Sequence, residues 1–226
     1  MDVTLHIVVE GPTEANFVNQ TLRQHLARFA VDVHVLVVTT KELSEFTYQG
    51  GIGDYAKPER DIRLLLSQHS NSDVRFTTMF DLYQLPEDFP GYAVAASYDD
   101  PYQRVRALED ALAEDIADSR FYPYIQMHEF EALLLSDPRK FESQFDNCAD
   151  GISKLVAMAS NFRSPELVND CNPPSKRINQ KLLNYNSWKS SVGPIVAGQI
   201  GLPTLRSKCA HFGAWLGKLE SLGEQL

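Results

Sequence analysis

Residues Val3–Glu14 read VTLHIVVEGPTE and lead from a strand through a turn into a helix. The near-continuous β-branched run Val3–Val9 is typical of a strand that is buried on both faces of a parallel sheet. Thr13 is a good helix N-cap, and apolar residues recur after it at three- and four-residue steps to about Arg28. A second apolar run, Val33–Val38, completes a β-α-β unit, which predicts two parallel strands joined by a right-handed crossover.

The alternation of strands and helices continues to about residue 137. The pattern predicts a glycine-containing loop over residues 41–58, strands at Val74–Phe80 and Phe121–Met127, and helices at Pro58–His69, Pro101–Ile116 and His128–Leu135. Asp100 is expected to cap the helix that begins at Pro101. After Pro138 the strand-like alternation disappears. We therefore expect an α/β core over residues 1–137 and a helical, basic part over residues 138–226 packed on that core.

Composition sets limits on the function. Of 226 residues, 43% are hydrophobic and 23% are charged, which is ordinary for a folded protein and excludes a wholly disordered chain. No apolar run approaches the roughly 20 residues that cross a bilayer, and no signal-peptide pattern opens the chain, so we expect a cytoplasmic protein without membrane contact. Three widely spaced cysteines support neither a disulfide framework nor a structural zinc site.

The charge is distributed unevenly along the chain. Net charge is −9, yet residues 1–150 hold 12 Lys and Arg against 26 Asp and Glu, whereas residues 151–226 hold 9 against 4. An acidic body with a basic C-terminal third is compatible with a division of work between metal binding and phosphate binding. Ordinary variation in surface charge explains it equally well.

Acidic residues follow three of the expected strands. Glu10 follows the first strand, with Glu14 four residues later; Asp81 follows the third, and Glu129 and Glu131 follow the fourth. Ligands of open parallel sheets bind beyond the carboxyl ends of the strands, so these acids are expected to meet there. Clustered carboxylates repel one another unless a cation is bound, and oxygen-only ligation suits Mg²⁺ or Mn²⁺. Such sites usually serve phosphoryl transfer.

Each acid also has a purely structural explanation. Glu10 and Glu14 suit the positive end of a helix, and Asp81 could cap a turn. Glu129 and Glu131 are two residues apart and cannot share one helix face, so at most one of them is expected to face the site.

The basic third offers candidate nucleic-acid contacts, namely Lys176, Arg177, Lys181 and Lys189. Ser175 is expected to cap a helix there, and the four-residue step from Arg177 to Lys181 places both cations on one face of it. Two nearby aromatic residues, Tyr185 and Trp188, could stack on bases. The alternative is a solvated basic surface with the aromatic residues in the core.

Four stretches of the chain resemble a bacterial Toprim-like family catalogued as domain of unknown function 4276. They are VEGPTE at Val9–Glu14, FDLY at Phe80–Tyr83, PYIQMHEFEALL at Pro123–Leu134 and PSKR at Pro174–Arg177. The strand ending in Glu-Gly-x-Thr-Glu more distantly resembles the Toprim fold of topoisomerases, primases and overcoming-lysogenization-defect nucleases. The resemblance implies a mostly parallel sheet flanked by helices, a helical C-terminal part and a nuclease centre that uses Mg²⁺ or Mn²⁺.

The resemblance also implies roles for individual residues. Glu10 would act in acid–base or metal chemistry, and Glu14 and Asp81 would bind metal. Toprim proteins carry Asp-x-Asp, but here the third position is Tyr83. The number of metals therefore stays open, unless Glu129 or Glu131 replaces the missing carboxylate.

The expected function is cleavage of phosphodiester bonds in nucleic acid, with DNA favoured over RNA. Families of this kind are often encoded beside an ABC- or AAA-type ATPase in phage-defence loci, so the resemblance implies an ATPase partner. Such a partner would account for the absence of a nucleotide-binding loop from this sequence. Two alternatives stay open: a non-catalytic binding or regulatory subunit, which Tyr83 favours, and a phosphohydrolase for a small phosphorylated substrate, which the acidic net charge would tolerate.

Overall fold

The computed structural model describes residues 2–38, 53–83, 85–168 and 172–225. Its centre is a parallel sheet in the order β2 (Val31–Val37), β1 (Val3–Val9), β3 (Val74–Asp81) and β4 (Phe121–Tyr122). Strand β5 (Ile125–Gln126) extends the same edge by pairing with β3. The predicted fold class is confirmed: the sheet is parallel, helices flank it, and the C-terminal part is helical.

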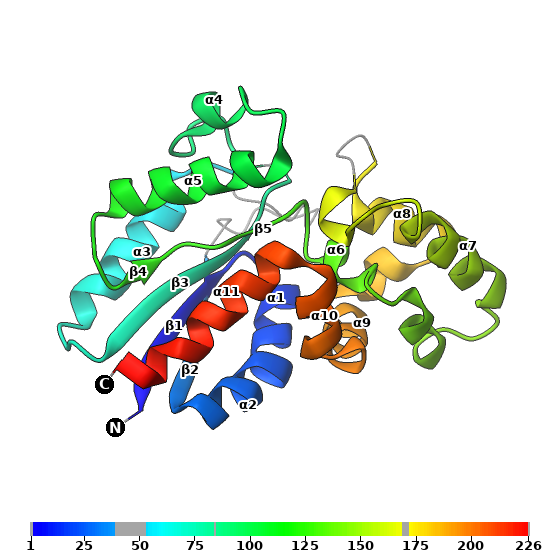
Figure 1. The fold of residues 1–226 in the computed structure, drawn as a ribbon, viewed down its shortest axis with the longest axis horizontal. Helices are drawn as coiled ribbons and strands as arrows, with labels where there is room; N and C mark the ends of the chain where they lie inside the picture. Colours follow the sequence, from blue (N-terminus) through cyan, green and yellow to red (C-terminus); the bar gives the residue numbers. More distant parts are fainter. Residues whose placement is uncertain (1, 39–52, 84, 169–171, 226) are drawn as a thin grey trace, which may run out of the picture.

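Helices cover both faces of the sheet (Figure 1). On one face lie α3 (Ala56–Gln68) and α5 (Pro101–Ile116), whose apolar side chains pack on the side chains of β3 that include Phe76 and Phe80. On the other face lie α1 (Pro12–Phe17), α2 (Arg23–Leu26) and α11 (Ala210–Glu220). The near-continuous apolar strands follow from this burial on both sides.

The first crossover helix starts earlier than expected. It begins at Pro12 with Gly11 as its N-cap, so the prediction that Thr13 caps it was wrong. Proline is well suited to the first helical position because its missing N–H would have no intrahelical partner there. The helix continues through a π-helical turn at Val18–Leu22 and α2, and ends in a 3₁₀ turn at Ala27–Phe29.

The fourth predicted strand is divided in two. Pro123 lies between β4 and β5, and a proline cannot donate to the hydrogen-bond ladder of a sheet. Helix α6 (Glu131–Leu134) then begins later than the predicted His128, whose φ of 61° is incompatible with a right-handed helix. The expected Asp100 cap is confirmed, since its carboxylate accepts the backbone N–H of Tyr102.

Short helices fill the remaining connections. Helix α4 (Tyr92–Ala95) lies in the segment before α5, and the expected loop over residues 41–58 falls mostly outside the described residues. The C-terminal part contains a 3₁₀ segment at Pro138–Ser143, α7 (Ala149–Ala159), a 3₁₀ turn at Pro165–Leu167, α8 (Pro174–Lys181), α9 (Tyr185–Ile200) and α10 (Leu202–Lys208), and after α11 a last 3₁₀ segment at Ser221–Gln225.

The C-terminal helices pack directly on the sheet layer. The Trp215 ring of α11 stacks on Tyr124 at a centroid distance of 4.2 Å, and its indole N–H donates to Thr77 of β3. The fully buried Glu166 accepts the backbone N–H groups of His211 and Phe212 and so holds the first turn of α11. Within the described residues, no helix combines the length and the apolar character needed to cross a membrane.

Candidate functional site

The carboxyl ends of β1 and β3 bring two predicted acids together. The two strands are neighbours in register, with Val9 opposite Met79. Glu10 follows β1, and its Oε1 accepts the backbone N–H of Asp81 at 2.7 Å. Its carboxylate therefore lies beside the last residue of β3. The pairing arises because β1 and β3 are adjacent parallel strands that end at the same edge of the sheet.

The segment before α6 joins the same edge. Asp81 Oδ1 accepts the backbone N–H of Phe130 at 2.9 Å, which holds the residues on either side of Phe130 against the end of β3. Glu129 precedes α6, whereas Glu131 is its first residue. The expectation that the two acids share one helix was therefore wrong, and with it the argument that only one of them can face the site.

Glu129 and Glu131 are fastened by different parts of the C-terminal region. Glu129 accepts the backbone N–H of Ser175 at 2.8 Å and its hydroxyl at 3.0 Å. Glu131 accepts the hydroxyl of the buried Tyr185 at 3.1 Å. The predicted Ser175 cap was wrong: helix α8 has Pro173 at its N-cap, and Ser175 is a donor to Glu129 instead.

Electrostatics show that the acids share one region. Burial, followed by repulsion from Glu14, raises the pKa of Glu10 to about 8. Burial and then repulsion from Glu14, Glu10, Glu131 and Glu129 raise the pKa of Asp81 well above its usual value. The buried Glu14, on the first turn of α1, has a raised pKa because of burial and of repulsion that includes Glu129. All these shifts favour loss of negative charge, so a bound cation would stabilise the ionised cluster.

Lys189 of α9 interacts electrostatically with these acids. Burial lowers its pKa, but attraction to Glu131, Asp81, Glu129 and Glu14 outweighs burial and leaves the pKa above its usual value. The same lysine opposes the effect of burial on Glu131, whose pKa is raised to about 7. Of the four predicted basic contacts, Lys189 is therefore the one that the fold brings to the carboxylates.

The other basic residues lie outside the acidic cluster. Lys176 and Lys181 are exposed on α8. Arg177 donates to the carbonyl of Asn172, and its guanidinium lies over the ring of Phe162 at 5.5 Å. These three residues supply positive surface charge rather than groups of the cluster itself.

The two candidate stacking residues differ in their exposure to solvent. Tyr185 is buried and occupied with Glu131, whereas the Trp188 side chain is 61% exposed on α9. Only Trp188 is therefore accessible for stacking on a base.

The donor set is chemically suited to a hard divalent cation. Glu10, Glu14, Asp81, Glu129 and Glu131 offer only carboxylate oxygens, which Mg²⁺ and Mn²⁺ prefer. Over the residues that the structure describes, no three His, Cys, Asp or Glu side chains already form a metal-binding group. Four of these carboxylates instead accept N–H or O–H groups of the protein. An ionised carboxylate has about four lone-pair sites, so these hydrogen bonds leave capacity for a metal ion.

Comparisons with known proteins found one matching family model and two similar structures. A family model described as "Domain of unknown function (DUF4276)" matches residues 9–220. Two structures of the C-terminal region of the OLD protein of Xanthomonas campestris pv. campestris, phased with platinum and with iodine, are 12% identical with TM-scores of 0.40 and 0.37. The alignments cover 96% and 94% of this chain and 94% and 95% of those chains. The comparison with curated proteins found no match.

Proposed function

The chain belongs to the family of domain of unknown function 4276, and from the five acids at its sheet edge we propose that it is a divalent-metal-dependent nuclease. The observation that carries the proposal is the contact between the Glu10 carboxylate and the backbone of Asp81, with Phe130 holding the next two acids beside them. A structural role alone gives no reason to gather so many acids at the end of parallel strands, where ligands of such sheets bind.

Glu10, Glu14 and Asp81 would hold the metal, and Glu129 or Glu131 would complete its ligands. A Mg²⁺ or Mn²⁺ ion bound there would supply an activated water and would neutralise charge on the leaving oxygen. Tyr83 stands where a further carboxylate would be, and its backbone N–H donates to the His128 carbonyl at 2.7 Å. Glu129 and Glu131 are the acids available to replace that carboxylate.

Lys189 and the surface of α8 would handle the phosphate backbone. Lys189 is attracted to four of the carboxylates, so it would contact a phosphate that approaches the metal. Lys176 and Lys181 would add weaker contacts that depend on salt concentration. Glu10, whose carboxylate accepts the backbone N–H of Asp81, would move protons during the reaction, as the family resemblance implies.

The substrate would be nucleic acid, with DNA favoured over RNA. An ATPase partner, encoded beside the chain, would supply the nucleotide-driven step. That part of the proposal rests on the family resemblance alone. It is tested by co-expressing the neighbouring ATPase gene and asking whether the two chains co-purify and whether ATP changes the rate of cleavage.

The central test is cleavage of labelled single- and double-stranded DNA and RNA with Mg²⁺, with Mn²⁺ and with chelator. The parent should cleave at least one substrate only with metal, and Glu10→Gln should lose that activity while keeping the fold. Glu142→Gln is the matched control, because it makes the same carboxyl-to-amide change at an exposed position outside the cluster. Equal activity in all three proteins would refute the assignment of Glu10.

The same assay separates the alternatives. A protein that binds nucleic acid but never cleaves it, with either metal, would support the non-catalytic alternative. Hydrolysis of a small phosphomonoester without cleavage of any nucleic acid would support the small-substrate alternative.

A further inference from the structure

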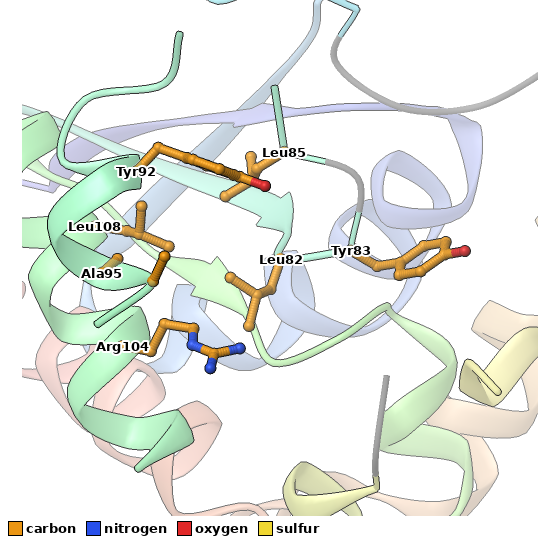
Figure 2. Close-up of a pocket in the computed structure, with 8 residues that line it drawn as sticks. Leu82, Tyr83, Leu85, Tyr92, Ala95, Arg104 and Leu108 are labelled. Carbon is orange, nitrogen blue, oxygen red and sulfur yellow. The ribbon is translucent and has the colours of Figure 1, made fainter. Parts of the chain in front are cut away.

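A cavity of about 230 Å³ opens beside the end of β3, on the sheet face that α5 covers (Figure 2). Its lining includes Leu82, Leu85, Tyr92, Ala96, Arg104 and Leu108. These residues come from the segment after β3, from the segment containing α4, and from α5. None of them is among the acids of the cluster.

The cavity and Asp81 of the acidic cluster lie at the same end of β3 but on opposite faces of the sheet. Successive side chains of a strand point to opposite faces. Met79 packs in the hydrophobic cluster beneath α1 and α11, and Phe80 packs in the one beneath α3 and α5. Asp81 accordingly continues the face of Met79 and Leu82 the face of Phe80. Asp81 and the cavity residue Leu82 are neighbours in the protein chain, so a strand of nucleic acid that crosses this edge of the sheet would pass from Asp81 to the cavity over a short distance.

The chemistry of the lining suits a flat, partly polar ring. Most of the walls are apolar, and Figure 2 shows the phenol ring of Tyr92 and the guanidinium of Arg104 at the border of the same space. Arg104 donates to the carbonyl of Tyr98 at 3.2 Å, which helps to direct its side chain. A guanidinium carries five N–H donors in a fixed planar fork, a geometry that suits acceptors on the edge of a planar ring.

The size of the cavity limits the ligand. Pockets for drug-sized molecules usually begin at about 300 Å³. A cavity somewhat smaller than that suits one planar ring system with its sugar and phosphate left outside. Nucleobases fit this description, because each has a face that stacks on aromatic rings and an edge with hydrogen-bond acceptors.

We propose that this cavity binds an unpaired nucleobase of the nucleic acid, next to the phosphate that lies at the carboxylates. The proposal rests on the proposed nuclease function and narrows it to substrates with an unpaired nucleotide near the cleaved bond. Tyr92 supplies a stacking surface, Arg104 donates to the base edge, and Leu82 and Leu108 exclude water from its faces.

Binding of single nucleotides tests the cavity without any cleavage. Calorimetry in the presence of chelator would compare the four deoxynucleoside 5′-monophosphates with deoxyribose 5-phosphate, which has the same phosphate and no base. For the parent we expect at least one mononucleotide to bind about tenfold or more tightly than deoxyribose 5-phosphate, because hydrogen bonds to a charged donor are strong when water is excluded.

Three variants give the result its meaning. Arg104→Met removes the donors but keeps an unbranched side chain, and Ala96→Phe fills the cavity without removing a polar group. Both variants should bind the mononucleotide no more tightly than they bind deoxyribose 5-phosphate. Arg106→Met, at an exposed position of the same helix, makes the same charge change outside the cavity and should preserve the tighter binding of the mononucleotide. Ala96→Phe decides the question if Arg104→Met does not fold.

The proposal is overturned if the parent binds no mononucleotide better than deoxyribose 5-phosphate, or if Arg106→Met weakens binding as much as Arg104→Met does. Its failure is distinguishable from failure of the nuclease proposal. Metal-dependent cleavage without base-dependent binding would remove the cavity proposal alone. Base-dependent binding in a protein that never cleaves would keep the nucleobase site and remove the nuclease.

Discussion

His6 should make the protein lose stability as the pH falls below about 6.5. The side chain is only 9% exposed, on β1, and its ring lies 5.3 Å from that of His34 and 4.4 Å from that of His69. Burial, then repulsion from His69 and His34, lowers its pKa from 6.5 to about 4, and only Asp32 opposes the shift. Within the described residues, its Nε2 is buried and has no hydrogen-bond partner. A charge on this ring is therefore poorly accommodated.

The sign follows from proton counting. Between pH 6.5 and about 4 the unfolded chain binds a proton at His6 that the folded chain does not, so acid favours unfolding over that interval. At about 1.4 kcal/mol per pKa unit the full loss would be about 3 kcal/mol. His34 is largely exposed, so solvent screens part of the repulsion, and we expect a loss of about 1 to 2 kcal/mol.

The assay is urea unfolding from pH 4 to pH 8 with parent, His6→Phe and His34→Phe. The many carboxylates also titrate in this range, so the informative quantity is the difference in unfolding free energy between variant and parent at each pH. The ring of His6 stacks on Phe76 at a centroid distance of 5.4 Å, and a phenylalanine at position 6 can do the same. The unfolding free energy of His6→Phe should therefore rise relative to that of the parent as the pH falls. His34→Phe should keep most of the parent's dependence of unfolding free energy on pH, because burial is the largest cause of the lowered pKa of His6. A difference for His6→Phe that stays constant from pH 7 to pH 4 would refute the reasoning.

Three further predictions concern the acids and the basic third. Mg²⁺ should raise the melting temperature of Glu10→Gln less than that of the parent, because the substitution removes one metal ligand. Thermal melts with and without Mg²⁺ measure this rise, and an equal rise in both proteins would exclude Glu10 as a ligand. Lys181→Ala should reduce the slope of log affinity against log salt concentration by about 0.9 for duplex DNA. Arg177→Ala should reduce this slope less, because the Arg177 guanidinium already donates to a backbone carbonyl. Equal slopes in the parent and in Lys181→Ala would show that α8 does not contact the DNA. Single-stranded DNA should quench the tryptophan emission of the parent but not that of Trp188→Phe, whose remaining Trp215 is only 5% exposed; quenching of the same size in both would remove Trp188 from the interface.

Most helices and strands could be predicted from the sequence. The β-branched run at Val3–Val9 forms β1 with the expected bounds, and α5 spans the expected Pro101–Ile116 with its Asp100 cap. These features depend on neighbours in the chain: the spacing of apolar residues, a capping side chain and the fixed φ of proline. The placement of acids after strands was readable for the same reason, and so were the positions of Glu10 and Asp81 at strand ends.

Tertiary structure decided which of these groups meet. The order β2-β1-β3-β4 places β1 beside β3, and that adjacency is what brings Glu10 to the backbone of Asp81. Packing of α9 brings Lys189 within electrostatic reach of the acids, although the sequence pattern groups it with Lys176, Arg177 and Lys181 as a basic surface. The positive φ of His128 keeps Glu129 outside α6, and packing of α8 brings the backbone N–H of Ser175 to the Glu129 carboxylate. Contacts between residues so distant in the chain depend on how whole faces of helices and strands pack, and no local spacing encodes that packing.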